Sequence, residues 1–597
     1  MKPLAQLCMF LLFSTVFALA TLVPANLQCR CLFGDACWPI ATQFSDLASQ
    51  VSLPLIQPIP PASPCYRSLN SSTNCNDVHL NWADGNWRAN QSGAMQSTNF
   101  ETFIWPNGTI DACYFNTSLN VPCTQGSVPI IGVNAQTPSD VQAAVKFASA
   151  HNLRLIVKNT GHDYLGRSTA KDSFLIWIHN MKNITFHETF VPTGAPPTEV
   201  YNKTLTLGAG VQWYEAYDAA HSHNVVIVGG LSAGGSVGSS GGWFQGGGHS
   251  ALSPSFGLGV DNVLELTVVT STGEHLTANS HIHSDLFWAL RGGGGGTYGI
   301  VTSVTYRTHP STPITATFLS TTIISNVTGP SPILTKLFTE LVRVTPNLSD
   351  SGWGGYTLFY PGTPGTSLAL QILYITPNLN VSNSVANSSI QSFYDYAQQL
   401  ATNSSMETGG LLNITAAVII ELDSFYAWET QYFRSSGQVG GNIELGSRLL
   451  PRNVIENDYE KVAKMLLPLP GLNYYLVAGG AVSRVNSSST GLNPAWRKAL
   501  VHTVFGGTWQ EGASAQEIMQ VGNTIKAGIA NLHALAPDSG AYFNEASKFE
   551  PDPLNTFFGS HYKALKDIKL KYDPYELFIV SKGVGSEDWD EDLNCKV

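Results

Sequence analysis

The distribution of cysteine constrains the fold of this chain more than any other sequence feature. Cys8 lies in an apolar N-terminal segment, and the other eight are Cys29, Cys31, Cys37, Cys65, Cys75, Cys113, Cys123 and Cys595. An even number is typical of disulfides in an oxidising compartment, but the sequence does not give the pairing. Seven of the eight precede residue 124, so if all pair, at least one disulfide joins Cys595 to the N-terminal segment. The two ends of the chain must then meet. A zinc site is not expected, because Cys29-x-Cys31 is too tight for ligand spacing.

The N-terminus reads as a cleaved signal peptide over residues 1–20. Lys2 precedes an apolar run from Leu4 to Leu19, and Ala18-Leu19-Ala20 fits the small-residue cleavage pattern. The alternative is a membrane anchor, but the run is short for a membrane span. We therefore expect a secreted protein with no membrane attachment after cleavage.

N-glycosylation signals support the same route. Asn-x-Ser/Thr occurs at Asn70, Asn90, Asn107, Asn116, Asn183, Asn202, Asn326, Asn347, Asn380, Asn387, Asn403, Asn413 and Asn486. Such a site requires a surface position in a secreted protein. None falls between residues 203 and 325, so we expect that region to be the buried functional part.

Composition and motifs exclude several classes of function. The formal net charge is −11, which disfavours binding to nucleic acid. Gly294, Gly296 and Gly299 match the letters of a dinucleotide-binding loop. In this sequence, however, the predicted order is helix, glycines, strand, whereas a Rossmann loop follows a strand and opens a helix. Nor does the chain contain a Walker A string, and no set of metal ligands stands out.

The chain divides by pattern into four parts after the signal peptide. Residues 21–123 form a Cys-rich extension, and residues 124–310 contain strands, helices and glycine clusters. Residues 311–535 alternate strands and helices, which predicts an inserted substrate domain. Residues 536–597 carry Cys595, and we expect them to return to the first domain.

Two segments in residues 124–310 suggest a ligand. A strand–helix–strand pattern over residues 128–157 is followed directly by Asn159-Thr160-Gly161-His162-Asp163-Tyr164. Such a loop can present backbone N–H groups to a diphosphate, although an ordinary turn with a surface histidine fits the residues equally well. Residues 229–248 contain ten glycines together with large apolar residues, so the segment is not a flexible linker. Glycine there allows the backbone to approach a ligand closely.

Three strings in order carry a family resemblance. Gly161-His162-Asp163-Tyr164, the block from Gly234 to Asn262, and Gly540-Ala541-Tyr542-Phe543-Asn544-Glu545 resemble the vanillyl-alcohol-oxidase/PCMH flavoprotein superfamily. The nearest branch is the berberine-bridge-enzyme-like oxidases of fungi, including those called isoamyl alcohol oxidases. The resemblance covers residue 124 to the C-terminus. It implies an α+β protein with a PCMH-type FAD-binding domain and a substrate domain made of an antiparallel sheet covered by helices.

The resemblance also implies a covalent flavin. His162 matches the histidine that bonds to the 8α carbon of FAD. Many relatives carry a second link through a cysteine, but Gly234 occupies that position here, so a monocovalent flavin is expected. The implied cofactor-binding residues are His162, Lys158, Asn159, Thr160, Gly161, Asp163, Gly235, Val237, Gly238, Gly241, Gly248, His249, Ile300, Val301 and Asn544. A small residue at Val237 suits reaction with O2.

Four residues are candidates for the catalytic base, and the sequence does not decide between them. Tyr164 matches an active-site tyrosine of plant relatives, and Tyr542 belongs to the Y-x-N string near the flavin. Relatives that act on sugars often have a second tyrosine where this chain has Glu545. His502 is the fourth candidate base. A tyrosine acts as a base at neutral pH only if its pKa is depressed.

These residues predict an FAD-dependent oxidase that transfers hydride from an alcohol or sugar-like small molecule to flavin, with O2 reduced to H2O2. A biosynthetic oxidase that closes a ring or desaturates a secondary metabolite would use the same fold and flavin. A non-catalytic secreted glycoprotein is the third hypothesis.

Overall fold

A computed structural model describes residues 29–66, 72–327, 329–361, 368–379, 383–435, 437 and 439–597. The predicted signal peptide and the glycosylation signals at Asn70 and Asn380 lie outside these residues. Within the described residues, none of the helices combines the length and the apolar character that a membrane crossing requires.

Four disulfides join the eight cysteines. Cys29 pairs with Cys595 across 566 residues of sequence, and the other bonds are local: Cys31–Cys37, Cys65–Cys75 and Cys113–Cys123. The prediction that Cys595 returns to the N-terminal segment is therefore confirmed. The backbone supports the junction, since Arg30 donates from its N–H to the Asn594 carbonyl oxygen.

The first layered unit is a small parallel sheet with one helix. Its order is β3 (Ile131–Asn134), β5 (Phe174–Trp177) and β4 (Leu155–Lys158), and α4 (Pro138–Ala150) connects β3 to β4. Pro138 at the first turn and a reciprocal Thr137–Asp140 capping box explain why the helix begins there. The sheet ends at Lys158, and the predicted loop at 159–164 therefore leaves from the carboxyl end of a buried strand.

A five-stranded antiparallel sheet follows in the chain. Its order is β10 (His275–Asn279), β9 (Val263–Val269), β11 (Ile300–Arg307), β7 (Tyr201–Gly208) and β6 (Ile184–Phe190). α5 (Trp213–Ser222) precedes the glycine-rich segment, and α8 (Ser284–Leu290) follows β10. The glycine-rich segment contains only short helical turns, including α6 (Gly242–Gln245).

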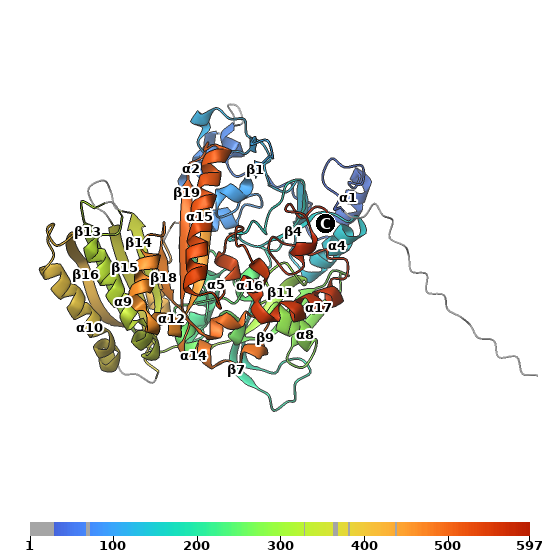
Figure 1. The fold of residues 1–597 in the computed structure, drawn as a ribbon. Coiled ribbons are helices and arrows are strands. Elements are labelled where there is room, and N and C mark those ends of the chain that lie inside the picture. Colours follow the sequence, from blue (N-terminus) through green and yellow to red (C-terminus); the bar gives the residue numbers. More distant parts are fainter. Residues whose placement is uncertain are drawn as a thin grey trace, which may run out of the picture.

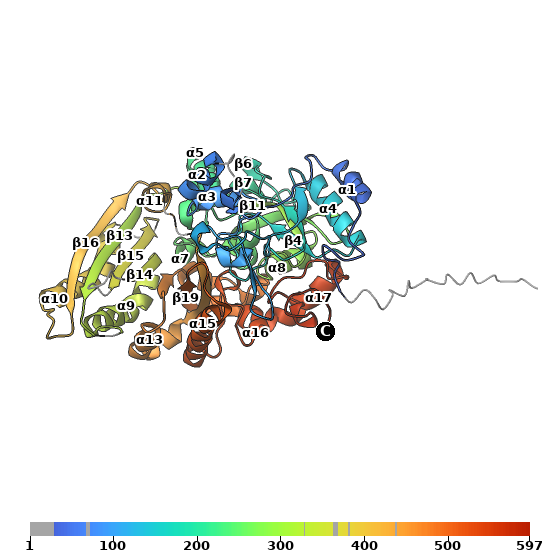
Figure 2. The ribbon, with the colours of Figure 1, turned by 90° about the horizontal axis from the view of Figure 1, so that it is seen from above.

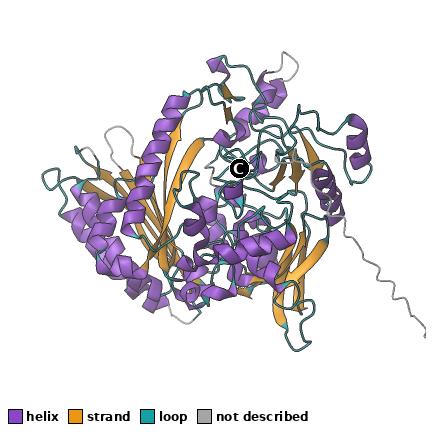
Figure 3. Ribbon diagram, turned by 45° about the vertical axis from the view of Figure 1, so that its right-hand side comes forward, coloured by secondary structure: helices purple, strands orange, loops and turns teal. Residues whose placement is uncertain are grey.

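The largest sheet has seven antiparallel strands. Their order is β16 (Leu411–Leu422), β13 (Ile314–Ile324), β15 (Leu368–Pro377), β14 (Gly354–Pro361), β18 (Asn473–Leu476), β19 (Ala499–Trp509) and β17 (Asn442–Pro451). The long helices α9 (Pro332–Asp350), α10 (Asn383–Thr402) and α15 (Ala515–Leu535) pack on its outer side (Figures 1 and 3). Below, this sheet is called the substrate sheet.

Strand alternation gives the substrate sheet two different faces. Val501 and Phe505 of β19 belong to the apolar core beneath the helices, together with Leu532 of α15. Their neighbours His502 and Val504 therefore point to the opposite face, because successive side chains of a strand alternate. That face is turned toward the first two sheets.

The C-terminal segment packs against the first half of the chain. α17 (Tyr562–Tyr572) packs against α8, and α16 (Pro553–Phe558) packs against α17 (Figures 1 and 2). Lys569 of α17 donates to the Thr297 carbonyl oxygen at 3.0 Å, and Arg154 donates to that of Ile579 at 3.2 Å. The mixture of helices with antiparallel sheets confirms the predicted α+β class. The domain boundaries themselves stay a prediction.

Candidate active site

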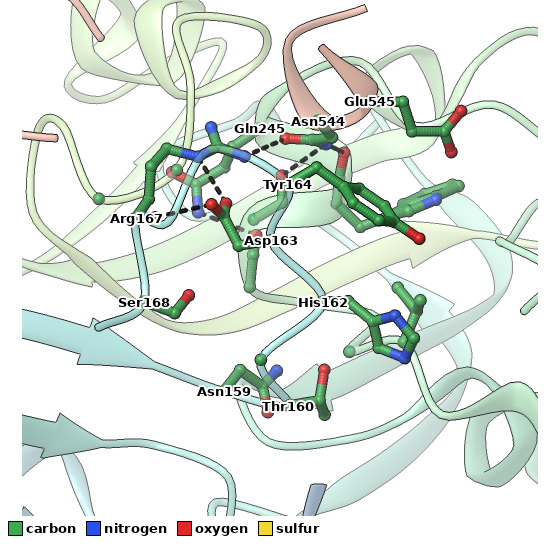
Figure 4. A pocket seen from close by; sticks show the side chains of 18 of the residues that line it. Asn159, Thr160, His162, Asp163, Tyr164, Arg167, Ser168, Gln245, Asn544 and Glu545 are labelled. Atoms are coloured by element: carbon green, nitrogen blue, oxygen red, sulfur yellow. Dashed lines mark hydrogen bonds and ion pairs between the residues drawn. The ribbon is translucent and has the colours of Figure 1, made fainter. Parts of the chain in front are cut away.

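A cavity of about 390 Å³ lies between the two smaller sheets and the substrate sheet. Most of its lining comes from the loop after β4, the glycine-rich segment, the C-terminal segment, and strands β17, β18 and β19 with the residues just before β17. β4, Ile178 and the segment from Gly295 to Val301 at the start of β11 complete it. Figure 4 shows Arg167 of the loop beside Asp163, Gln245 and Asn544, with Tyr164 nearer to Glu545 and with Asn159 and Thr160 at the other end of the loop.

Most of the predicted site residues line this one cavity. They are Asn159, Thr160, Gly161, His162, Asp163, Tyr164, Val237, Gly238, Gly241, His249, Ile300, Val301, Tyr542, Asn544 and Glu545. Four of the predicted residues do not line the cavity: Lys158, Gly235, Gly248 and His502. Gly235 and Gly248 have φ values of +68° and +73°, and a Cβ at either would press on Tyr214 or Trp243 at 2.7 Å. These two glycines therefore shape the wall without forming its surface.

The His162 loop is held by its own polar residues. Asn159 donates to the Ala209 carbonyl oxygen at 2.7 Å, and Gly161 adopts φ +80°. A hydrogen bond of 2.7 Å joins His162 Nε2 to Ser236 Oγ in the glycine-rich segment. Burial lowers the pKa of His162 to about 3, so the imidazole is neutral at ordinary pH. A neutral imidazole retains the lone pair that a nucleophile needs.

Arg167 is a site residue that the sequence reasoning missed. Its guanidinium forms a buried ion pair with Asp163 and donates from Nη2 to Asn544 Oδ1 at 3.0 Å. Nη1 is buried without a hydrogen-bond partner, and the side chain lines the cavity. The spacing of Asp163 and Arg167 gave no signal, because the i,i+4 pairing rule applies to helices and these residues lie in a loop.

A carboxylate flanked by two histidines forms the opposite end of the site. His249 Nε2 lies 3.2 Å from Glu545 Oε1, and His502 Nε2 lies 2.9 Å from Oε2. Burial alone would raise the pKa of Glu545, but the two histidines outweigh it and hold that pKa well below its usual range. Burial lowers the pKa of His502 although Glu545 opposes the shift. The Glu545 carboxylate can therefore accept a hydrogen bond from Nε2–H of each histidine.

The tyrosines around this cluster are protonated at neutral pH. Burial is the main cause that raises the pKa of Tyr164 and of Tyr542, and the charge of Glu545 adds to it. Tyr475 of β18, a further lining residue that the sequence reasoning missed, has a raised pKa for the same reasons. These phenols can donate hydrogen bonds, whereas a phenolate base would need a depressed pKa.

The lining fits a large polar and aromatic cofactor. Asn159 Oδ1, Arg167 Nη1 and Gln245 Oε1 are buried without hydrogen-bond partners, and such groups require a ligand or water. Gly238 leaves no room for a side chain, because a Cβ there would lie 2.1 Å from Asn159 Nδ2. Apolar side chains at one end of the cavity, from Ile300, Phe578 and Ile579, suit an aromatic ring.

Three groups of side chains have the spacing for a metal ion among the described residues. Two of them consist largely of disulfide-bonded cysteines, which are not thiolate ligands. The third is His249, His502 and Glu545. Nδ1 of both histidines is buried without a partner, whereas metal-binding histidines usually have their second nitrogen hydrogen-bonded. An acid–base role fits this cluster better than a metal.

Comparison with known proteins identifies the family. The FAD binding domain family matches residues 129–279, and the berberine and berberine-like family matches residues 541–585. An uncharacterised FAD-linked oxidoreductase of Arthroderma benhamiae is 37% identical, over 96% of both chains. The FAD-linked oxidoreductase ZEB1 of Gibberella zeae is 32% identical, over 95% of this chain and 94% of that protein.

Solved structures agree with the sequence comparison. The crystal structure of the VAO-type flavoprotein MtVAO615 from Myceliophthora thermophila is 29% identical, with a TM-score of 0.82 over 95% of this chain and 100% of the other. Berberine bridge enzyme from Eschscholzia californica, 16% identical, shares the fold with a TM-score of 0.63 over 91% of this chain and 98% of that one. The hypothesis of a non-catalytic glycoprotein is thereby set aside. This chain belongs to the FAD-linked oxidoreductases of the vanillyl-alcohol-oxidase and berberine-bridge-enzyme type.

Proposed function

We propose that this protein is a secreted oxidase that carries FAD on His162 through a single covalent bond and oxidises an alcohol with O2. The alcohol loses a hydride from carbon and a proton from oxygen, and O2 takes up the two electrons and two protons as H2O2. Bound FAD supplies the hydride acceptor and the route of the electrons to O2.

The observation that carries this proposal is the placement of a nucleophile and a base in one cavity. His162 is neutral and lines the cavity, and Glu545 lines the same cavity as an anion. His249 and His502 are almost completely buried, whereas the Glu545 side chain is 25% exposed. Glu545 is therefore the member of the cluster that is most open to a substrate hydroxyl.

Glu545 accepts the hydroxyl proton in this proposal, and the two histidines hold its carboxylate in place. The protonated phenols of Tyr164 and Tyr475 can donate hydrogen bonds to the substrate oxygen, because both line the cavity. This division of roles leaves the tyrosines as orienting groups. A positioned base contributes up to about 10²- to 10⁴-fold to the rate, and the contribution is smaller when the pKa of the base lies far below the working pH, as it does for Glu545.

Two residues of the glycine-rich segment support an oxidase with one flavin link. Val237 lines the cavity with a small side chain, which leaves room for O2. Gly234 carries no sulfur to form a second bond to the flavin. N-linked glycans at the predicted sites would accompany secretion.

A second candidate is oxidative ring closure or desaturation of an apolar metabolite. Val439, Ile443, Leu445 and Val504 give the substrate sheet an apolar surface in the cavity. Such a surface binds a carbon skeleton better than a sugar, since each buried hydroxyl without a partner costs about 1–3 kcal/mol. Both candidates use the same flavin and the same hydride transfer.

The test is a denaturing gel of the purified protein viewed under ultraviolet light after acid treatment, with the flavin-bearing peptide located by mass. A fluorescent band and a flavin mass on the His162 peptide support the covalent flavin. A dark band from yellow protein refutes the role of His162. H2O2 release from simple alcohols separates the alcohol oxidase from the biosynthetic enzyme, which would give none.

A further inference from the structure

The part of the Cys-rich extension from Trp82 to Glu101 contacts two segments on different sides of the cavity: the His162 loop and the residues at the start of β17. It contains α3 (Gly85–Ala89) and the short turn η2 (Thr98–Glu101), and it lies outside the regions that the two families match. We call residues 82–101 the strap. In Figure 1 it belongs to the lighter blue part of the chain, next to the orange strands of the substrate sheet, whereas the dark-blue helix α1 (Ala41–Ala48) lies on the far side of β4.

Gln96 of the strap supports the backbone just before His162. Its Nε2 donates to the Thr160 carbonyl oxygen at 2.9 Å, and its backbone N–H donates to that of Gly161 at 3.1 Å. The Gln96 side chain is 3% exposed, so water does not compete for these bonds. Gly161 has no room for a side chain against the strap, because a Cβ would lie 3.0 Å from the Ala94 carbonyl oxygen.

The same residue also reaches the substrate sheet. The Gly440 N–H donates to the Gln96 carbonyl oxygen at 2.8 Å, next to the lining residue Val439. Thr98 continues this pairing with a backbone bond of 3.0 Å to the Gly441 carbonyl oxygen. Asn99 Oδ1 accepts from the N–H of Ile443, which lines the cavity, at 3.1 Å. One short stretch therefore fixes the start of β17 relative to the His162 loop.

A second path leads from the strap to the His162 side chain. Asn86 donates to the Gly234 carbonyl oxygen at 3.1 Å and accepts from Gln212 Nε2 at 2.8 Å. Gln212 Nε2 also donates to the Ser236 carbonyl oxygen at 3.1 Å, and Ser236 Oγ bonds to His162. The strap thus holds the residue that orients the imidazole.

The strap is itself tightly fixed. Arg88 and Glu101 form an ion pair with side chains that are 0% and 6% exposed, and both bond to the backbone of Met95. Lys158 Nζ donates to the carbonyl oxygens of Gln91 and Ser92 at 2.7 and 3.0 Å. The strap and the end of β4 therefore behave as one rigid piece.

We propose that the strap is a positioning element of the active site. Gln96 and Asn86 hold His162 in the orientation that allows its bond to FAD, and Gln96, Thr98 and Asn99 hold the substrate sheet at a fixed distance from it. Neither Gln96 nor Asn86 lines the cavity, so they act through other residues. This inference rests on the proposed attachment of FAD to His162.

The experiment compares three variants with the wild-type protein. Gln96→Met removes the side-chain donor at similar length, Gln96→Glu keeps the shape but cannot donate from its carboxylate, and Asn86→Ala breaks the second path. Asn81→Ala is the matched control, because the side chain of Asn81 bonds within its own helix, to Asp77. The readouts are the fraction of the His162 peptide that carries flavin and the melting temperature of the protein.

We expect a fall of at least fivefold in the flavin-bearing fraction for the Gln96 variants and a smaller fall for Asn86→Ala, with the control unchanged. Added FAD that binds without a covalent bond would show that the cavity survives in these variants. Folded variants with the wild-type fraction of covalent flavin would overturn the inference. The inference would also be overturned if the flavin-bearing fraction fell only in variants that no longer melt cooperatively, because the loss of flavin would then follow from misfolding. Absence of flavin from the wild-type His162 peptide would refute the proposed function instead.

Discussion

Replacing Glu545 by glutamine tests the proposed acid–base cluster most directly. The change keeps the volume of the side chain but removes the charge that His249 and His502 share. Each of the two contacts, at 3.2 and 2.9 Å, is a hydrogen bond to an ionised group, and such a bond contributes about 1.5–3 kcal/mol. An amide oxygen can accept from one imidazole N–H, but its NH2 group then meets the other N–H, so one contact is lost or one histidine changes tautomer.

The rate should fall because Glu545 is the only carboxylate that the described residues place at this end of the cavity. A loss of a positioned base corresponds to about 10²- to 10⁴-fold in the rate of substrate oxidation. The assay is the rate of flavin bleaching after rapid anaerobic mixing with an alcohol that is a substrate of the wild-type protein. Glu421→Gln, on the edge strand β16, is the matched control. Mass spectrometry of the His162 peptide verifies that flavin loading is equal.

The acid dependence of stability should change in the same variant. The pKa of Glu545 lies below its ordinary value in the folded protein, so its contribution is present above the ordinary pKa and is lost as the pH falls through the folded-state pKa. The wild-type protein should therefore lose melting temperature more steeply than Glu545→Gln when the pH is lowered below about 4.5.

In the bleaching assay, a rate for Glu545→Gln within threefold of the wild-type rate would refute the role of Glu545 as base.

Three further changes have definite expected outcomes. Gly238→Ala should reduce the bound flavin, because its Cβ would lie 2.1 Å from Asn159 Nδ2, whereas Gly441→Ala, with nothing within 4 Å, should not; absorbance of the purified proteins decides this. Cys595→Ser should lower the melting temperature, since the Cys29–Cys595 bond closes a loop of 566 residues, and the chain-entropy account gives about 6 kcal/mol for a loop of that length; an unchanged melting temperature would contradict it. Burial lowers the pKa of Lys158 from 10.5 to about 7. Between pH 7 and pH 10.5 the unfolded chain therefore binds more protons at this residue than the folded protein does, so the stability of the wild-type protein should rise with pH in that window relative to Lys158→Met. Parallel melting temperatures of the two proteins across that window would refute this.

Local sequence was sufficient for several parts of the fold. The Thr137–Asp140 capping box and the apolar residues of α4 specify that helix within a few residues of chain. The loop at His162 follows a short buried strand, and its glycine takes the positive φ that the turn requires. Cysteine counting required the ends to meet because seven of the eight lie together. These inferences hold because the interactions concerned are local or covalent.

The sequence alone determined that a glycine-containing loop follows a buried strand, that a second strand-and-helix region follows it, and that the ends of the chain are joined if all eight cysteines pair. The expectation that this loop binds flavin came from the family resemblance. Only the tertiary structure decided which groups meet at the site. His249, His502 and Glu545 come from the glycine-rich segment, from β19 and from the C-terminal segment, and packing of three sheets brings them within 4.8 Å. Tertiary packing also places Gln96 in contact with both the His162 loop and the residues before β17. It likewise brings Asn544 of the C-terminal segment within hydrogen-bond distance of Arg167. Periodicity specifies which face of an element is buried, but not which distant element covers it, because that choice depends on the packing of the whole chain.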